Sequence, residues 1–313
     1  MTSPKILAVG GAHIDRRGQM TGPFVPGASI PGTMREDVGG GAFNALRTAA
    51  QRGARGAIMS MRGGDPAGDT VARAIAKAGI LDLSAVFLDR ATPSYTALLD
   101  SEGDVVAALA DMQLYEIAFP KQIRRAKLRE EIAAADAIFC DANIPAAGLQ
   151  RLAPLAADKP IFAIAISPAK AVRLTETLPA LSCLYMNWRE AAALAGMGGD
   201  DPVEAIVERL RALGLARGVI TQGSRQVIGF DPSVVIAIGP PAPRRIADVT
   251  GAGDALAGAM TVALLNRAPF GEALREGMAA ALLAVESPTS VPDLSKRAFA
   301  EALALVPDAA EMP

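Results

Sequence analysis

The chain has 313 residues, of which 51% are hydrophobic and 20% charged, with a formal net charge of −2. This size and composition suit one large α/β domain or two small ones with a buried core, and they exclude a disordered chain. The weak net charge and scattered arginines exclude a nucleic-acid surface, which needs clustered Lys and Arg. The one dense basic patch, residues 121–127, is typical of the solvated face of an amphipathic helix.

The first residues pass directly into an apolar run at 6–9, and no apolar span approaches 18 residues. We therefore expect neither a signal peptide nor a membrane-spanning helix, and a cytoplasmic protein. Cys140 and Cys183 each lie in an apolar run, which predicts buried thiols and neither a disulfide framework nor a metal site. His13 is the sole histidine, so His-based zinc clusters are excluded.

Short apolar runs alternate with helical patterns along the chain. Strands are expected at residues 6–9, 56–61, 137–140, 161–166, 183–186, 218–221 and 234–238. Helices are expected at residues 43–52, 69–78, 120–134, 189–195, 202–213, 254–266 and 270–285. The alternation predicts βαβ units and an α/β fold with a mostly parallel sheet covered by helices on both faces.

Two segments break this alternation. Residues 16–37 are rich in Gly and Pro, and residues 92–110 contain two strand-like runs, 94–99 and 104–109, joined by a turn at 101–103. A hairpin set apart from an α/β sheet often closes over a ligand, so we expect a small β lid. The alternative is that both segments are ordinary surface excursions.

A glycine turn with a carboxylate stands at residues 248–258, before an alanine-rich helix. Gly251 and Gly253 allow unusual backbone dihedrals, so the amides of residues 251–253 can converge on one anion at a helix start. Such donors stabilise a migrating phosphoryl group, and Asp254 beside them can accept the proton of an attacking hydroxyl. The alternative is a plain strand-to-helix turn in which Asp254 is an N-terminal cap. No Gly-Lys dipeptide occurs, which excludes a P-loop.

Three landmarks, in this order, resemble the ribokinase-like sugar and nucleoside kinases, also called the PfkB family. They are the glycine-rich stretches at 10–15, 39–44 and 63–68, the Asn187-x-x-Glu190 element, and the turn at 251–254. The resemblance covers nearly the whole chain. It implies a single ribokinase-like domain of residues 1–313, with three α/β/α layers and a β lid formed by residues of about 16–37 and 92–110.

The resemblance also assigns an acceptor site and a catalytic turn. The acceptor residues would be Asp15, Gly39, Gly40 and Asn44. Asp15, expected at the end of the first strand, can accept two hydroxyl hydrogen bonds. The catalytic residues would be Asp254 as the base, with Gly251, Ala252 and Gly253 holding the charge.

On the nucleotide side the resemblance implies ATP and Mg²⁺. Asn187 and Glu190 would organise Mg²⁺ through water, since Mg²⁺ keeps several of its waters. The nucleotide itself would be contacted by Asn187, Thr221, Gly223, Gly251 and Gly253. The loop from Asp248 to Thr250 resembles one that binds a monovalent cation in relatives, so K⁺ is a further expected cofactor.

Within the family, four stretches are similar to the pseudouridine kinases. These stretches are 93–100 with 110–112, 140–144, 248–254 and 292–295. This likeness implies that Asp111 and Asn143 line the acceptor pocket and that ATP and pseudouridine give pseudouridine 5′-phosphate. Ribose, adenosine, other nucleosides and sugar phosphates remain alternatives, and the exposed lid strands favour a homodimer.

The chain departs from the family pattern at Ala42, Ser167 and Gln226, where glycine, aspartate and glycine are usual. These changes keep open a non-catalytic sensor of nucleotides or sugars on the same fold, although Asp254 is intact. A dinucleotide-dependent oxidoreductase is disfavoured, because Gly10 and Gly11 are followed by His13 and not by a third glycine and a helix.

Overall fold

The structure is a computed structural model that describes residues 3–288 and 292–312, so the ends of the predicted domain, 1–2 and 313, lie outside it. A ten-stranded sheet forms the centre of the described chain, in the order β16-β15-β14-β13-β12-β11-β10-β1-β4-β6. Its strands are parallel from β6 to β13 and antiparallel from β13 to β16. The bounds are β1 (Lys5–Val9), β4 (Arg55–Met59), β6 (Leu81–Asp82), β10 (Ala137–Asp141), β11 (Ile161–Ile164), β12 (Cys183–Asn187), β13 (Gly218–Thr221), β14 (Val227–Phe230), β15 (Val235–Ile238) and β16 (Ala310–Glu311).

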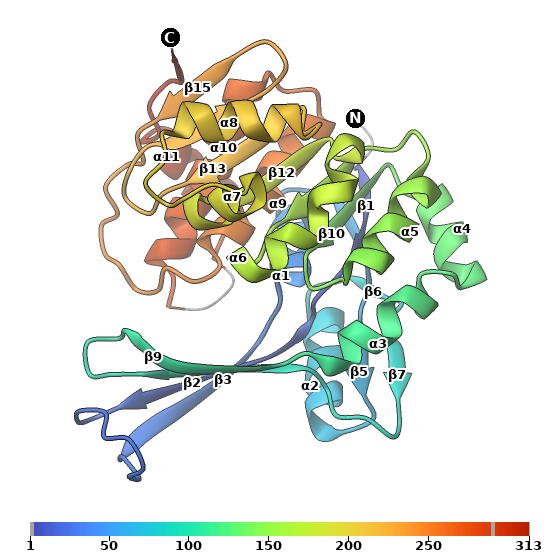
Figure 1. The fold of residues 1–313 in the computed structure, drawn as a ribbon, viewed down its shortest axis with the longest axis vertical. Coiled ribbons are helices and arrows are strands. Elements are labelled where there is room, and N and C mark those ends of the chain that lie inside the picture. The colour runs from blue at the N-terminus through green and yellow to red at the C-terminus, as the bar shows by residue number, and fades with distance from the viewer. Residues whose placement is uncertain (1–2, 289–291, 313) are drawn as a thin grey trace.

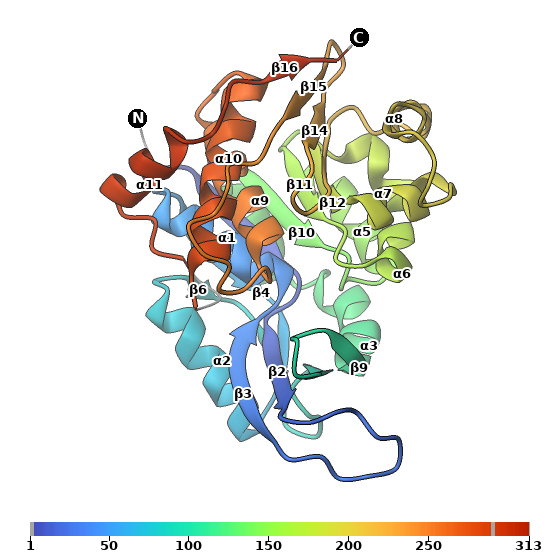
Figure 2. The same cartoon turned by 90° about the vertical axis from the view of Figure 1, so that its left-hand side faces the viewer.

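Helices cover both faces of this sheet (Figures 1 and 2). Successive side chains of β1 point to opposite faces, so Leu7 and Val9 enter one core while Ile6 and Ala8 enter the other. The first core packs against α3 (Gln113–Gln122), α4 (Ala126–Ala134), α5 (Ala146–Ala156), α6 (Pro168–Ala171), the 3₁₀ helix η1 (Val172–Ala180), α7 (Trp188–Ala195) and α8 (Val203–Ala212). The second packs against α1 (Gly41–Gln51), α2 (Pro66–Lys77), α9 (Ala252–Leu265), α10 (Phe270–Glu286) and α11 (Lys296–Leu303). The predicted three-layer α/β/α fold is confirmed.

A second sheet extends from the main body, and we call it the projecting sheet (Figure 1). It has the strand order β3-β2-β8-β9, with bounds β2 (His13–Met20), β3 (Gly32–Gly39), β8 (Ser94–Leu99) and β9 (Val105–Asp111). The predicted hairpin is therefore present, and the Gly- and Pro-rich segment holds two further strands that begin earlier and end later than 16–37. A short pair, β5 (Met61–Gly63) with β7 (Ala85–Phe87), makes a third sheet.

The predicted helix at 120–134 and the predicted strand at 56–61 are wrong in detail, and strand β14 was missed. The helix expected at 120–134 is two helices, because the chain turns at the buried Ile123 and is extended at Arg125, so the basic patch lies at their junction. The strand expected at 56–61 divides at Ser60, whose hydroxyl accepts the amide of Ala12. Strand β14 was not expected, because Gly229 interrupts its apolar run; a Cβ there would meet Leu274 and Phe270 at 2.9 Å.

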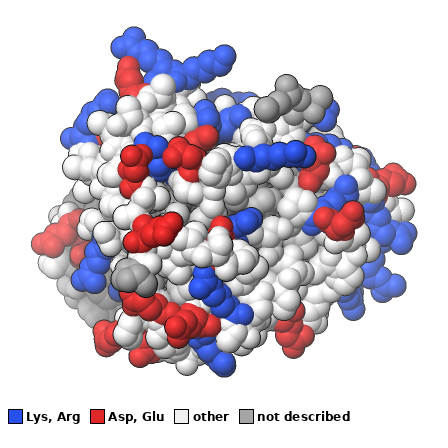
Figure 3. Space-filling model, turned by 90° about the horizontal axis from the view of Figure 1, so that it is seen from above, with Lys and Arg blue, Asp and Glu red and all other residues white. Residues whose placement is uncertain are grey.

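The two cysteines are buried, as predicted, and the surface carries charges of both signs. Cys140 and Cys183 are both buried free thiols. Acidic and basic side chains are interspersed over the face in Figure 3. None of the described helices is both long and apolar enough to cross a bilayer.

Candidate active site

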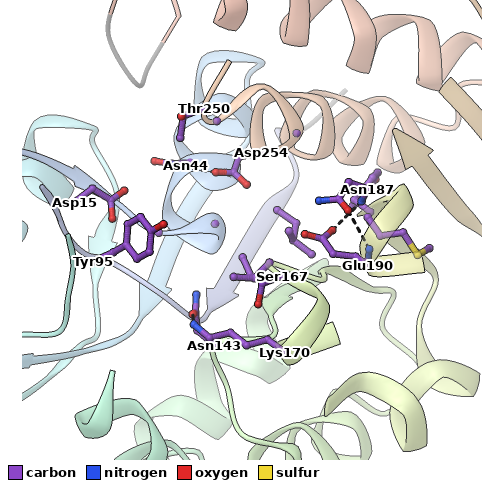
Figure 4. Close-up of a pocket in the computed structure, with 18 of the residues that line it drawn as sticks. Asp15, Asn44, Tyr95, Asn143, Ser167, Lys170, Asn187, Glu190, Thr250 and Asp254 are labelled. Atoms are coloured by element: carbon purple, nitrogen blue, oxygen red, sulfur yellow. Dashed lines mark hydrogen bonds between the residues drawn. The ribbon is translucent and has the colours of Figure 1, made fainter. Parts of the chain in front are cut away.

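A cavity of about 520 Å³ lies where the parallel strands end and the projecting sheet begins. Strands β10 to β13 point their carboxyl ends at it, which is the usual position of a ligand site in an open α/β sheet. Figure 4 shows polar side chains from both sheets around this space. The residues of the predicted site that line it are Asp15, Gly40, Asn44, Asn143, Asn187, Glu190, Thr221, Thr250, Gly251, Gly253 and Asp254.

Helix α9 begins at one end of the cavity with unpaired amides. Its N-cap, Gly251, has φ 81°, a left-handed conformation that favours glycine. Within the described residues, the amides of Gly251, Gly253 and Asp254 make no hydrogen bond to protein. The amide of Ala252, which was predicted to hold charge, instead donates to Val249 over 3.5 Å, and Ala252 does not line the cavity. The amides that are free to bind an anion at this positive helix end are therefore those of residues 251, 253 and 254.

The carboxylate of Asp254 lies beside these amides. Its Oδ2 accepts a 2.8 Å hydrogen bond from Nδ2 of the buried Asn44, and Arg47 in turn donates to Oδ1 of Asn44. Burial raises the pKa of Asp254 to about 7, although the bond from Asn44 acts in the opposite direction. A carboxyl with a pKa near neutrality is suited to general base catalysis.

Asp15 faces the cavity from the projecting sheet. It lies inside β2 and not at the end of the first strand as predicted, and its Oδ1 is 3.3 Å from Nε2 of His13. Gly39 leaves room for this carboxylate, because a Cβ at position 39 would collide with Asp15 Oδ2. Gly40 has φ 109°, and a Cβ there would collide with the carbonyl of Gly11. The glycines thus let the backbone approach Asp15 and the cavity closely.

A buried carboxylate, Asp141, organises the floor of the cavity. Its Oδ2 accepts hydrogen bonds from the backbone amides of Gly11 and Ala42, each at 2.9 Å, and from Nδ2 of Asn143 at 3.1 Å. The side chain of Asp141 is 0% exposed. The departure from glycine at Ala42 therefore leaves the backbone contact of that position intact.

On the opposite wall, Asn187 and Glu190 form a capping box at the start of α7. Glu190 N donates to Asn187 Oδ1 at 3.0 Å and Asn187 N donates to Glu190 Oε2 at 2.8 Å, the dashed bonds of Figure 4. Burial raises the pKa of Glu190. Hydrogen bonds from the backbone and the side chain of Asn187 act in the opposite direction.

These residues fit a hydrated Mg²⁺ held mainly by phosphate. No group of three His, Cys, Asp or Glu side chains among the described residues could enclose a metal. Mg²⁺ usually needs only one or two carboxylates when it binds with a nucleotide and keeps its waters. Glu190 supplies one such oxygen at the cavity wall.

The loop predicted to hold K⁺ contacts the projecting sheet. Asp248 forms an ion pair with Arg17 of β2, and its Oδ1 accepts the amide of Thr250 at 2.8 Å. Partial burial alone would raise the pKa of Asp248, but these bonds hold that pKa below its usual range. Each oxygen of Asp248 thus already accepts one bond, so K⁺ bound there would share this carboxylate with Arg17.

Five predicted residues do not line the cavity: Gly39, Asp111, Gly223, Asp248 and Ala252. Asp111 is exposed at the end of β9, while its neighbours Ala110 and Met112 do line the cavity, as alternation along a strand requires.

Conversely, sequence reasoning assigned no role to Tyr95, Asp141 or Lys170, nor to Arg47 behind Asn44. Asp141 and Lys170 could have been found, because each stands at or just after the carboxyl end of a predicted parallel strand.

Comparison with known proteins places this geometry in context. A family model described as pfkB family carbohydrate kinase matches residues 3–297. Pseudouridine kinase from Escherichia coli is 28% identical over 309 residues, 97% of each chain, and ribokinase from Haemophilus influenzae is 27% identical over 279 residues, 83% of this chain and 85% of that one. A solved carbohydrate kinase from Agrobacterium tumefaciens is 44% identical with a TM-score of 0.87 over 100% of both chains. Arabidopsis thaliana ribokinase complexed with ribose and ATP has 22% identity and a TM-score of 0.84, covering 96% of this chain and 99% of that one.

Proposed function

The chain belongs to the pfkB family of carbohydrate kinases, and we propose that it transfers the γ-phosphoryl group of ATP to the 5′-hydroxyl of a nucleoside, with pseudouridine as the preferred acceptor. The observation that carries this proposal is that the carboxylate of Asp254 and three amides without hydrogen-bond partners lie side by side at the start of α9. A base and an anion site side by side are what phosphoryl transfer to a hydroxyl needs, because the nucleophile loses a proton while charge spreads over the phosphoryl oxygens.

In the proposed mechanism, Asp254 accepts the proton of the attacking hydroxyl. Asn44 holds Asp254 Oδ2 at 2.8 Å, which orients the carboxylate before the acceptor arrives. The amides of Gly251, Gly253 and Asp254 stabilise the negative charge of the migrating group without moving. Bound Mg²⁺, near Asn187 and Glu190, would neutralise charge on the nucleotide phosphates.

The acceptor would occupy the half of the cavity between Asp15 and Asn143. Asp15 can accept hydrogen bonds from two neighbouring ribose hydroxyls, and Gly40 lets the sugar approach the backbone. Pseudouridine is supported by the 28% identity to pseudouridine kinase over nearly the whole chain. Ribose is the second candidate, since ribokinase from Haemophilus influenzae is 27% identical.

The projecting sheet would act as the lid and as a dimer surface. It carries Asp15 and Tyr95 into the cavity, so its position decides how well water is excluded. Every residue of β9, an edge strand, is exposed, including Leu109 at 70% and Val105 at 58%. An exposed apolar edge strand favours pairing with a second copy, and we therefore propose a homodimer.

An ATP-consumption assay with a panel of acceptors tests the proposal. The panel should contain pseudouridine, uridine, adenosine, ribose and no acceptor, each with Mg²⁺. We expect the highest kcat/KM with pseudouridine and a product phosphorylated at the 5′ position. If ribose is the best acceptor, the protein is a pentose kinase and the nucleoside proposal is wrong. If the protein binds nucleotide but turns over no acceptor, the alternative of a non-catalytic sensor of nucleotides or sugars is favoured.

A further inference from the structure

Lys170, in α6, has its side-chain amine in the cavity. Its Nζ donates a 2.7 Å hydrogen bond to Oδ1 of Asn143 (Figure 4). Among the described residues that line the cavity, Lys170 is the only Lys or Arg. The next cation, Arg173, is bound to Glu116 at 2.7 Å and is not part of the cavity wall.

The surrounding bonds fix where this amine points. Nδ2 of Asn143 donates to Asp141 Oδ2 at 3.1 Å, and Asn143 N donates to Asp141 Oδ1 at 3.0 Å. The amide oxygen of Asn143 must therefore face Lys170. A lysine amine has three donors, and the bond to Asn143 uses the only one that pairs within the described chain. Two donors remain for a ligand, on an amine that burial has partly desolvated, as its lowered pKa indicates.

The position of Lys170 along the cavity identifies which part of the acceptor it meets. A nucleoside bound as proposed, with its 5′-hydroxyl at Asp254 and its ribose at Asp15, would direct its heterocycle away from Asp254. Figure 4 shows Lys170 and Asn143 together, apart from Asp254 and Thr250. Tyr95 and Met112 line the cavity as well and offer apolar surface to a flat ring.

We propose that Lys170 is a specificity-determining residue that donates hydrogen bonds to a carbonyl oxygen of the acceptor's heterocycle. The proposal rests on the proposed nucleoside kinase function and narrows its acceptor to nucleosides with a carbonyl-bearing ring, such as a pyrimidinedione. A bare pentose has no heterocycle and therefore offers this amine no ring carbonyl. A ring without carbonyl groups leaves two donors of this partly desolvated amine without a partner, which gives the site a means of rejection.

The test compares two acceptors that share the ribose and the carbon–carbon glycosidic bond. Pseudouridine carries two ring carbonyls, whereas the C-nucleoside β-D-ribofuranosylbenzene carries none. The variant Lys170→Met removes the amine and keeps an unbranched apolar stem of the same length, and Lys77→Met, on the exposed end of α2, is the matched control. For each protein, kcat and KM are measured with both acceptors at saturating ATP and Mg²⁺.

We expect the ratio of kcat/KM for pseudouridine to that for the phenyl analogue to fall about 10- to 100-fold in Lys170→Met, mainly through KM, and to stay unchanged in Lys77→Met. An unchanged ratio overturns the proposal: a common fall in kcat would assign Lys170 to the transferred phosphoryl group, and no change at all would leave it without a role in recognition. A wild-type protein that phosphorylates no nucleoside refutes the proposed function itself, which is a different outcome from an unchanged ratio.

Discussion

If Asp254 is the base, the pH dependence of turnover should report the ionisation of its carboxyl group. Only the ionised carboxylate can accept the proton of the acceptor hydroxyl. Burial moves this pKa from 3.8 to about 7, so the ionised fraction is about one tenth at pH 6 and about one hundredth at pH 5. We expect kcat/KM for the acceptor to fall by these factors below pH 7 and to reach a plateau above pH 8.

A discontinuous assay of the phosphorylated product from pH 5 to 9, at saturating ATP and Mg²⁺, measures this profile. Because ATP ionises in the same range, Arg47→Gln is the control. Arg47 favours the ionised form of Asp254, so its loss moves the acidic limb to higher pH without touching ATP. An unchanged circular dichroism spectrum at pH 5 excludes unfolding, and recovery of activity after return to pH 8 excludes irreversible inactivation. A profile that is flat between pH 5 and 8, or one that Arg47→Gln does not move, refutes the reasoning.

Two further predictions concern the projecting sheet. Because Arg17 forms an ion pair with the carboxylate of Asp248, we expect weak activation by K⁺ in the wild type and a lower half-activating K⁺ concentration in Arg17→Gln. Equal rates in K⁺, Na⁺ and tetramethylammonium for both proteins would show that no monovalent cation activates the enzyme. Because Leu109 is 70% exposed on β9, Leu109→Asp should shift the proposed dimer toward monomer in analytical ultracentrifugation. Glu102→Asp, in the adjacent turn, is the control. A dimer mass that Leu109→Asp leaves unchanged would exclude this face as the interface.

The layers of the fold follow from local patterns in the sequence. The runs at Ile161–Ile164 and Gly218–Thr221 are short, apolar and separated by helical periods, which is enough to predict buried parallel strands. Strand β14 was not predicted, because Gly229 interrupts its apolar run. The side chains of Phe270 and Leu274 fill the space beside Gly229, and this packing cannot be read from the local sequence.

The site was predictable where one segment supplies both position and chemistry. Asp254 and the Asn187 to Glu190 capping box each stand at a helix start that the sequence marks. By contrast, the contact of Arg17 with Asp248 joins residues 231 positions apart, and sequence reasoning had no means of pairing them. Asp111 was misplaced for a related reason, since the face to which a β9 side chain points depends on the register of the whole projecting sheet.

Turnover by Asp254→Asn tests the central claim most directly. The substitution keeps the shape of the side chain and removes its ability to accept a proton. A buried carboxylate with a raised pKa is disfavoured in its ionised form, so the variant should unfold at a temperature no lower than the wild type at pH 8. With pseudouridine and ATP still binding, we predict that kcat falls about 10²- to 10⁴-fold. A kcat close to that of the wild type would contradict the assignment of Asp254 as the base.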